Sequence, residues 1–296
     1  MQFFQVDAFT RQPLTGNPAV VVLGSDGLAE GQLQAIAREL RHAEVAFVLA
    51  PDGADHDLRV RFFNARKETA FVGHATIAAH AVLLSRGLRP EGLVRQKSGT
   101  GILEVGAGKA PDGIVEVEFR QGAPELQEPL SLRQVLRVAQ ALRLPAQRLH
   151  ERLPARVARK GSSRLLIPVS APEALDDLAP DRNALLELGR ELGAEGFFVV
   201  NPSRTPQGMF TCSRMFCPDT GIDEDPASGN AHAMLAACLW AAGELEARDP
   251  RFTGLQGKQM MRPSQIHVVP EIEGGVLRAT RIRGAAIILA DGTLRL

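Results

Sequence analysis

The chain has 296 residues, of which 45% are apolar and 23% charged, so it is long enough to bury two hydrophobic cores. Its 34 Lys and Arg residues balance its 34 Asp and Glu residues without a long run of either sign, so nucleic acid and membrane are not expected as partners. No apolar run is long enough to span a bilayer, and the first ten residues read as a strand rather than a signal peptide, which predicts a cytoplasmic protein. Three cysteines without CxxC spacing argue against a disulfide framework and a zinc ribbon.

The first half of the chain is predicted to be rich in strands. Residues 3–9 and 19–23 have strand-like patterns on either side of a turn-rich segment, which predicts a hairpin with a long loop. Apolar side chains at helical spacing predict a surface helix over residues 31–41. Residues 121–130 contain two prolines and are the best candidate for a linker. Further strands are predicted at 45–50, 58–63, 93–96, 101–105 and 114–119.

The second half has a similar mixture of patterns. Helices are predicted at 132–142 and 182–192. The combination favours a strand-dominated α+β fold. Strands are predicted at 165–169, 196–201, 208–217, 265–269, 276–282 and 285–289.

One unusual design occurs twice: an almost wholly apolar helix that begins at a glycine and follows an acidic loop. The copies read ETAFVGHATIAAHAVLL around Gly73 and DEDPASGNAHAMLAACLW around Gly229, 156 positions later. A strand segment, AEVAFVL, is echoed by AEGFFVV 151 positions later. Both halves also have an Arg-apolar-Phe step before the acidic loop, at 61–63 and 214–216. Such similar spacing favours a duplicated fold.

Both repeated helices are too apolar to have a face in solvent. Residues 74–84 contain two histidines and one threonine among apolar side chains, and residues 231–242 contain only His232 as a polar exception. Each helix is therefore expected to be buried on nearly all sides. In a strand-rich protein this predicts two similar lobes, each a barrel-like, mostly antiparallel sheet wrapped around one central helix.

The start of a buried helix leaves backbone N–H groups without partners inside the helix. Gly73 and Gly229 remove side-chain bulk there, so a ligand anion can approach these donors and the positive end of the helix dipole. The alternative is that the glycines serve only a turn, and that Thr76, Ser228 or water caps the helices. The matched pair of glycines beside acidic loops favours an anion site.

Three titratable side chains are candidates for chemistry near these helix starts. Glu44 begins an apolar strand, where burial would raise its pKa toward the range that suits general acid–base catalysis. A solvated carboxylate is the alternative, and Glu195 has the equivalent place in the second half. His74 follows Gly73 and is expected to be a neutral donor or proton relay, or else a core histidine. Asp225 precedes a proline and either contributes to the site or caps the next helix.

Several blocks of the chain carry a family resemblance. They read VDAFT, TGNPAVVVL, RELRHAEVAFV, RFFNARKETAFVGHATIAAH and SRMFCPDTGIDEDPASGNAHAMLA. Together they closely resemble the PhzF-like phenazine-biosynthesis isomerase family, whose fold is that of diaminopimelate epimerase. The resemblance implies one lobe from residues 1–121 with 285–296, a second from residues 122–284, and an active site in the cleft between them. It also implies a homodimer that moves a proton within a small carboxylic acid without a cofactor or metal.

The resemblance assigns roles to individual residues. Glu44 matches the family's catalytic acid–base, His74 its active-site histidine, and Asp225 the active-site aspartate of its EDP motif. Gly73 and Gly229 match the glycines at the substrate-facing helix starts.

One departure from the family concerns Asn230, which stands where many members have serine. Its amide differs from a hydroxyl in reach, so the substrate need not be the phenazine precursor dihydro-3-hydroxyanthranilate. Ser228 precedes the second glycine and is a further candidate for substrate binding. Distant epimerases of this fold use two facing cysteines at the positions of His74 and Asn230, which argues against two-thiol racemisation here.

We therefore expect an isomerase in which Glu44 removes a proton from carbon and returns it elsewhere on the same acid. His74, Asp225 and Asn230 would orient the acid, as in a trans-2,3-dihydro-3-hydroxyanthranilate isomerase. The alternatives are an epimerase or racemase of the same fold and a non-catalytic protein that binds small acids. A metal hydrolase lacks HxxxH or HExxH spacing, and a serine hydrolase lacks its GxSxG elbow.

Overall fold

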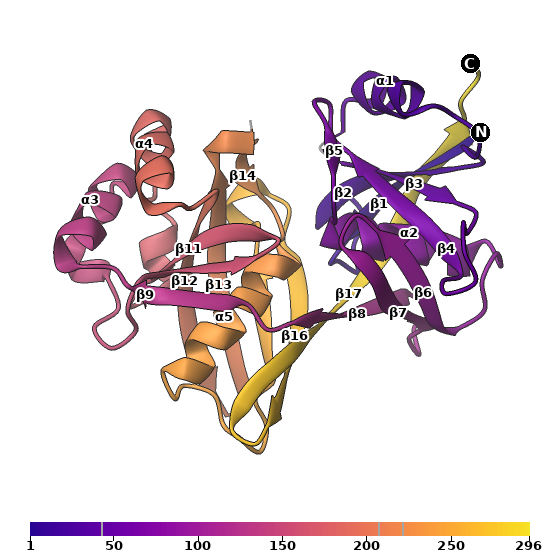
Figure 1. Ribbon diagram of the computed structural model, residues 1–296. Coiled ribbons are helices and arrows are strands. Elements are labelled where there is room, and N and C mark those ends of the chain that lie inside the picture. Colours follow the sequence, from indigo (N-terminus) through magenta and orange to yellow (C-terminus); the bar gives the residue numbers. More distant parts are fainter. Residues whose placement is uncertain (43, 207, 221) are drawn as a thin grey trace. The chain divides into compact units, whose positions relative to one another are not determined.

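The computed structural model describes residues 1–42, 44–206, 208–220 and 222–296 (Figure 1). Within these ranges the chain forms five α-helices and 17 strands. It divides into two compact units, one of Met1–Arg120 with Ile282–Leu296 and one of Gln121–Arg281. In the described part of the chain, none of the helices has the length and apolar character needed to cross a membrane.

In the first unit eight strands close into a barrel. Strands β1 and β2 pair antiparallel, β2 and β3 parallel, β3 and β4 antiparallel, and β4 and β6 parallel. The barrel continues antiparallel through β6, β7 and β8, and β17 closes it by pairing with both β8 and β1. Closure leaves these strands without a free edge. The eight barrel strands are β1 (Gln2–Ala8), β2 (Asn17–Leu23), β3 (Val45–Leu49), β4 (Leu58–Phe63), β6 (Gly92–Ser98), β7 (Gly101–Lys109), β8 (Val115–Gly122) and β17 (Val276–Thr293). A further two-residue strand, β5 (Glu68–Thr69), pairs with β4.

Two helices connect the parallel strand pairs of this unit. Helix α1 (Glu30–Leu40) joins β2 to β3 and buries Leu33, Ile36 and Ala37 against the strands. Helix α2 (Gly73–Ser85) lies between β5 and β6 in sequence and contacts β1, β2, β3 and β7 (Figure 1). Its residues from Ala75 to Leu84 are all buried. An apolar helix without a polar face needs a sheet on every side, which the barrel provides.

The second unit repeats the strand directions of the first. Pairs β10–β11, β12–β13 and β15–β16 are antiparallel, whereas β11–β12 and β13–β15 are parallel. This is the order of directions found from β1 to β7 once β5 is left out. Strand β9 extends the sheet beside β10. The strands are β9 (Glu125–Pro129), β10 (Arg156–Lys160), β11 (Ser162–Pro168), β12 (Gly196–Thr205), β13 (Gly208–Cys217), β14 (Ile222–Asp225), β15 (Phe252–Gln256) and β16 (Ser264–Glu273).

Helix α5 (Gly229–Ala241) is the central helix of the second unit. It contacts β10, β11 and β16, and its residues are buried nearly throughout. Like α2 it has 13 residues and begins at the repeated glycine. Helices α3 (Leu132–Leu142) and α4 (Arg182–Leu192) pack together over a separate apolar cluster that includes Leu142 and Leu185. The expected α+β fold, with a barrel-like sheet around a central helix, is confirmed.

Two sequence expectations about strands were wrong. The linker expected at 121–130 is largely sheet, because β8 runs to Gly122 and β9 pairs antiparallel with β10. The two strands expected at 276–282 and 285–289 form one 18-residue strand, β17. Gly284 does not interrupt β17. A Cβ at this position would lie 2.4 Å from Cδ1 of Phe9, so the glycine leaves space for the Phe9 ring.

Sequence patterns also missed the short strands β5 and β14 and the longer strands β10 and β15. Strand β10, RVARK, has three basic residues in five, and β15, FTGLQ, contains Gly254 at its centre. A Cβ at Gly254 would lie 2.1 Å from Nε2 of His232, so this glycine makes room for a buried ring of α5. Both strands depend on non-local packing that local patterns do not record.

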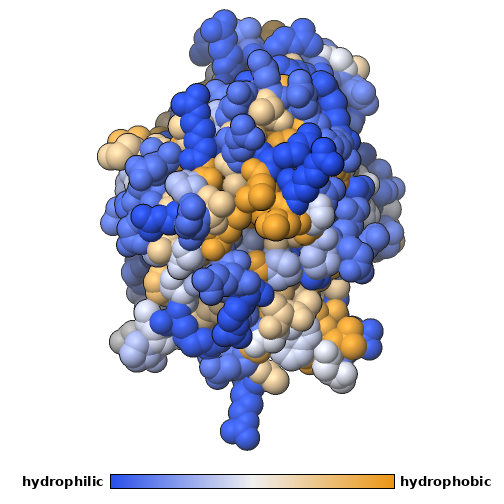
Figure 2. All heavy atoms as spheres, turned by 90° about the vertical axis from the view of Figure 1, so that its left-hand side faces the viewer, coloured by the Kyte–Doolittle hydropathy of each residue, from blue (hydrophilic) through white to orange (hydrophobic). Residues whose placement is uncertain are grey.

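The face of the molecule seen in Figure 2 includes the side on which α3 and α4 lie in Figure 1. Apolar surface there forms a small central patch surrounded by hydrophilic residues. On α3, Leu132 and Leu136 are exposed. Apolar surface of this extent is ordinary for a folded protein.

Candidate functional site

Helix α2 begins without a side-chain cap. Its N-cap residue is Val72, which has extended backbone angles and no side-chain acceptor. Thr76 is not a cap either, because its Oγ1 donates to the carbonyl oxygen of Val72 at 2.9 Å. In the described structure the first N–H groups of α2 therefore lack a side-chain partner. Such donors at the positive end of a helix are suited to an anionic ligand.

Gly73 has a packing role as well. A Cβ at this position would lie 3.1 Å from Cζ of Phe119, tighter than ordinary van der Waals contact. Phe119 also packs edge-on against Phe71, with ring centroids 5.4 Å apart, and Phe71 packs against Phe62 at 6.0 Å. The glycine thus lets α2 begin directly over a cluster of aromatic rings.

His74 differs from the other histidine of α2. Its Nε2 atom is buried and has no hydrogen-bond partner among the described residues. Burial lowers the pKa of His74 to about 4, so the imidazole is neutral near pH 7. By contrast, Nε2 of His80 lies 2.9 Å from Oε1 of the buried Gln96, as in a satisfied core histidine. His74 therefore has an unused ring nitrogen beside the start of the helix.

Glu44 lies immediately before β3 and is fixed by its backbone. Its carbonyl oxygen accepts a hydrogen bond from Val20 N of β2 at 3.2 Å, one step before the register pair Val20 and Val45. The side chain is half-buried, and its Oε2 atom is inaccessible to solvent. Two residues earlier, burial lowers the pKa of His42, opposed by the charge of Asp7.

Glu195, the counterpart of Glu44 in the second unit, has different surroundings. Its side chain is 53% exposed, and Oε2 accepts from Ser163 N at 2.8 Å. The same oxygen lies 3.7 Å from Nη1 of Arg164. The carboxylate of Glu195 is therefore largely in solvent and already has an N–H donor and a guanidinium beside it. The two repeated glutamates thus differ although the sequence repeat treats them alike.

At the start of α5 a serine provides the cap that α2 lacks. Oγ of Ser228 accepts from Ala231 N at 3.2 Å, as one sequence alternative anticipated. Buried Gln256 fixes the turn before it, since its Oε1 accepts from Ser228 N at 3.1 Å and its Nε2 donates to the carbonyl oxygen of Asp225. A carboxylate oxygen of Asp225 accepts from Ala227 N at 3.3 Å. Sequence reasoning missed Gln256, which lies in the unpredicted strand β15.

The side chain of Asn230 is tied to its own unit. Its Nδ2 donates to Oγ of Ser162 at 2.8 Å and to the carbonyl oxygen of Lys160 at 3.3 Å. Its Oδ1 accepts from Nε2 of Gln121. The amide group of Asn230 is therefore already engaged by groups of its own unit. None of these three partners was foreseen, because each is distant from Asn230 in sequence.

Each unit has an arginine–glutamate pair before its central helix. Arg61 donates from Nε and Nη2 to the two carboxylate oxygens of Glu68, at 2.7 Å in both cases. Arg214 makes the same two bonds to Glu224, at 2.9 and 2.8 Å. In both units the glutamate lies five residues before the glycine that begins the helix. These bidentate pairs anchor the short strands β5 and β14 from which the chain enters each helix start.

The repeated Arg-apolar-Phe step supplies these arginines. Each guanidinium also lies over the phenylalanine two residues later, 5.1 Å from the ring centroid of Phe63 and 5.0 Å from that of Phe216. The repeated arginines were visible in the sequence, but their pairing with Glu68 and Glu224 was not predicted.

Among the described residues, no group of three or more His, Cys, Asp or Glu side chains is arranged to hold a metal ion.

Comparisons with known proteins give a consistent result. The sequence model of the family described as "Phenazine biosynthesis-like protein" matches residues 6–292. The chain is 37% identical to the "Uncharacterized isomerase YddE" of Escherichia coli O157:H7, over 97% of this chain and 96% of that protein. It is 28% identical to the trans-2,3-dihydro-3-hydroxyanthranilate isomerase of Pseudomonas aeruginosa, over 98% of both. The crystal structure of a phenazine biosynthesis protein of the PhzF family from Bacillus anthracis has a similar fold, with a TM-score of 0.87, 24% identity, and 100% and 99% of the two chains covered.

Proposed function

The chain belongs to the phenazine biosynthesis-like family and is an isomerase, and we propose that it moves a proton within a small carboxylic acid without a cofactor, using Glu44 as the general acid–base. The observation that supports this most directly is the buried carboxylate oxygen of Glu44. Desolvation favours the protonated form of a carboxyl group, which lets it both accept and donate a proton near neutral pH. The side chain of the counterpart Glu195 is 53% exposed, so it does not share this desolvation.

In the proposed reaction Glu44 removes a proton from a carbon of the bound acid and returns it to another carbon. The carboxylate, or the enolate-like charge that develops, is bound by the uncapped N–H groups at the start of α2. Neutral His74 offers Nε2 to the substrate as a hydrogen-bond acceptor or proton relay.

The second unit is proposed to act on the same substrate. Asp225 and the backbone N–H groups of Gly229 and Asn230 would orient the acid, and Ser228 would hold the helix start in place. Because the amide group of Asn230 is already bonded within its own unit, having asparagine here in place of serine would alter the shape of the site rather than supply a new donor.

The family resemblance also leads us to propose that the protein is a cytoplasmic homodimer. Sedimentation equilibrium would test this oligomeric state.

The test compares two matched variants, Glu44→Gln and Glu195→Gln. Purified protein is incubated in D2O with trans-2,3-dihydro-3-hydroxyanthranilate and a panel of small cyclic acids, and deuterium incorporation is followed by mass spectrometry. We expect Glu44→Gln to fold, to retain binding and to lose at least about 10²-fold in turnover, the usual contribution of a general acid–base group. Glu195→Gln should exchange at the parent rate.

Equal losses in the two variants, or near-normal turnover by Glu44→Gln, would show that Glu44 is not the proton carrier. The position of deuterium separates the reaction classes. Inversion at one carbon without a double-bond shift would identify an epimerase. Binding of an acid without any exchange would identify a protein that binds small acids only.

A further inference from the structure

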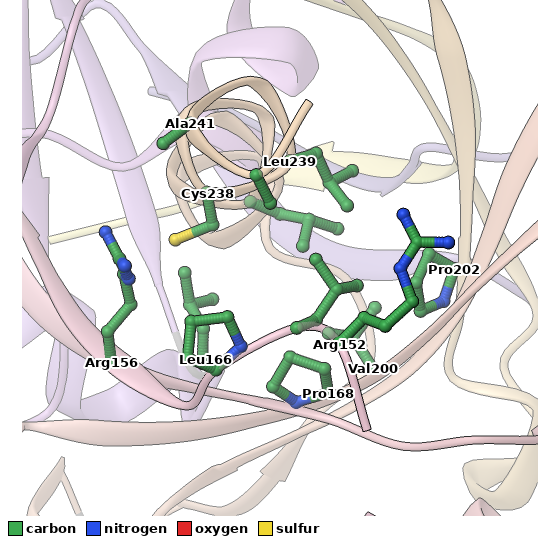
Figure 3. A pocket seen from close by; sticks show the side chains of 13 residues that line it. Arg152, Arg156, Leu166, Pro168, Val200, Pro202, Cys238, Leu239 and Ala241 are labelled. Atoms are coloured by element: carbon green, nitrogen blue, oxygen red, sulfur yellow. The ribbon is translucent and has the colours of Figure 1, made fainter. Parts of the chain in front are cut away.

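A cavity lies at the end of α5 that is remote from Gly229. Its volume is about 190 Å³, and it is enclosed by the last turns of α5 and by residues of β10, β11 and β12 (Figure 3). Cys238, which lines it, is eight residues beyond Asn230, so about 12 Å of helix separates the cavity from the helix start. None of the residues proposed for proton transfer lines this cavity.

The walls of the cavity are mainly aliphatic. Leu239 of α5 faces Leu166, Pro168 and Val200 of the sheet (Figure 3), and Leu235 of α5 also lines the cavity. An apolar cavity of about 150 Å³ is large enough to bind benzene. This cavity therefore has room for one aromatic ring or a short branched alkyl group.

Two arginines lie on opposite sides of this apolar space (Figure 3). Nη2 of Arg152 lies 3.1 Å from Oε1 of Glu244, so its charge is partly balanced, and its side chain is 79% exposed. Arg156 is half-buried, and in the described residues no carboxylate lies within ion-pair distance of it. The cavity thus combines an apolar interior with one guanidinium that, within the described part of the chain, has no carboxylate at ion-pair distance.

The remaining polar groups around the cavity do not cancel this charge. Burial raises the pKa of the Cys238 thiol to about 12, against the opposing effect of Arg156, so the thiol is neutral. At the end of α5 the carbonyl oxygens of Cys238, Leu239 and Trp240 accept from Ala242 N, Glu244 N and Gly243 N at 2.9–3.1 Å. Because these carbonyls are bonded, the negative end of the helix dipole opposes an anion less than an open helix end would.

We propose that this cavity is a second binding site, for a small aromatic or branched monocarboxylate. The carboxylate pairs with the guanidinium of Arg156, and the apolar body lies between Leu235, Leu239 and Val200. Guanidinium and carboxylate form charge-assisted hydrogen bonds that are stronger than neutral ones, and the aliphatic walls add the free energy of burying the apolar body. The site does not depend on the proposed isomerase mechanism, because it shares no residue with it.

The experiment is a titration with benzoate, followed by NMR of leucine and valine methyl groups, which reports the location of binding. Benzoate should shift the methyl signals of Leu235, Leu239 and Val200. Arg156→Gln should weaken this binding by about tenfold or more, the usual effect of removing a hydrogen bond to a charged group. Arg190→Gln, at an exposed position on α4, is the matched control and should leave the affinity unchanged.

Two further measurements separate recognition of the anion from simple filling of the cavity. Benzyl alcohol has nearly the shape of benzoate without its charge and should bind clearly more weakly to the parent protein. Cys238→Phe should fill the cavity and abolish the methyl shifts. If Cys238→Phe does not fold, the Arg156→Gln measurement still tests the proposal. Equal affinity for benzyl alcohol and benzoate, or benzoate shifts confined to residues outside the cavity, would overturn the proposal.

Discussion

Burial and hydrogen bonding at single residues distinguish side chains that the sequence patterns treat alike. A carboxylate oxygen of Glu44 is buried, whereas Glu195 is exposed beside Arg164. Within α2, His80 is bonded to Gln96, whereas Nε2 of His74 has no partner in the described residues. The sequence predicted the helix and the place of both histidines in it. It did not predict which one is satisfied, because Gln96 lies on a strand that reaches His80 only in the folded barrel.

The buried histidines should make stability depend on pH. Burial lowers the pKa of His80 and of His232 to about 4, from about 6.5 in an unfolded chain. Between these values the unfolded state binds more protons, so stability falls as pH falls from about 6.5 toward 4. Each imidazole contributes a slope of up to about 1.4 kcal/mol per pH unit.

Urea unfolding of His80→Gln at several pH values checks this prediction. The variant should lose less stability than the parent between about pH 6.5 and pH 4, whatever its stability at pH 7. Carboxylates titrate in both proteins, so the difference between the two slopes isolates His80. Parallel pH profiles would mean that His80 takes up its proton as readily in the folded protein as in the unfolded chain.

At the scale of elements, Gly73 at the start of α2 both packs against Phe119 and leaves space beside the uncapped backbone N–H groups. Gly73→Ala would place a Cβ 3.1 Å from Cζ of Phe119, where the ring must move, and would fill space above the uncapped N–H groups. We expect weaker binding of benzoate to the helix start, measured by calorimetry in an Arg156→Gln background so that the second cavity does not contribute. Gly31→Ala is a suitable control, because a Cβ on α1 at that position meets nothing within 4 Å. Unchanged affinity in a folded Gly73→Ala protein would make the glycine purely structural.

The arginine–glutamate pairs offer a comparison between two burial levels. Side chains of Arg214 and Glu224 are only 10% and 13% exposed, whereas those of Arg61 and Glu68 are 27% and 37% exposed. Glu224→Gln leaves a nearly buried guanidinium without its carboxylate and should cost about 3–5 kcal/mol of unfolding free energy. Glu68→Gln should cost about 1 kcal/mol or less, because solvent screens the more exposed pair.

Urea denaturation of both variants, with Arg214→Met and the double variant completing a thermodynamic cycle, measures these costs. The order of the two effects is the decisive result. A larger loss at Glu68 than at Glu224 would mean that burial does not set the strength of these pairs.

At the scale of the whole chain, the sequence predicted what repeats and missed what is particular to one copy. The apolar helices, their glycine starts and the sheet around each follow from patterns present twice. The partners of Asn230 were missed because Gln121 and Ser162 are 109 and 68 residues away in sequence. The sequence predicted two strands in place of β17 because Gly284 looks locally like a turn. In the structure, Gly284 is needed because the ring of Phe9 packs where a Cβ would lie.

The C-terminal segment gives the last prediction, because the first barrel depends on residues from the far end of the chain. In β17, Ala286 to Thr293 pair with all seven residues of β1, and this strand also borders β8. A chain ending at Arg281 would leave β1 and β8 with unpaired edges and uncover buried Phe4 and Val6. We expect it to aggregate or to lose the near-ultraviolet and methyl NMR signals of the first barrel. A chain ending at Leu294 keeps this pairing, together with the hydrogen bonds between Leu294 and Met1, so it should remain folded. A soluble, fully folded product from the shorter chain would show that the barrel does not need its closing strand.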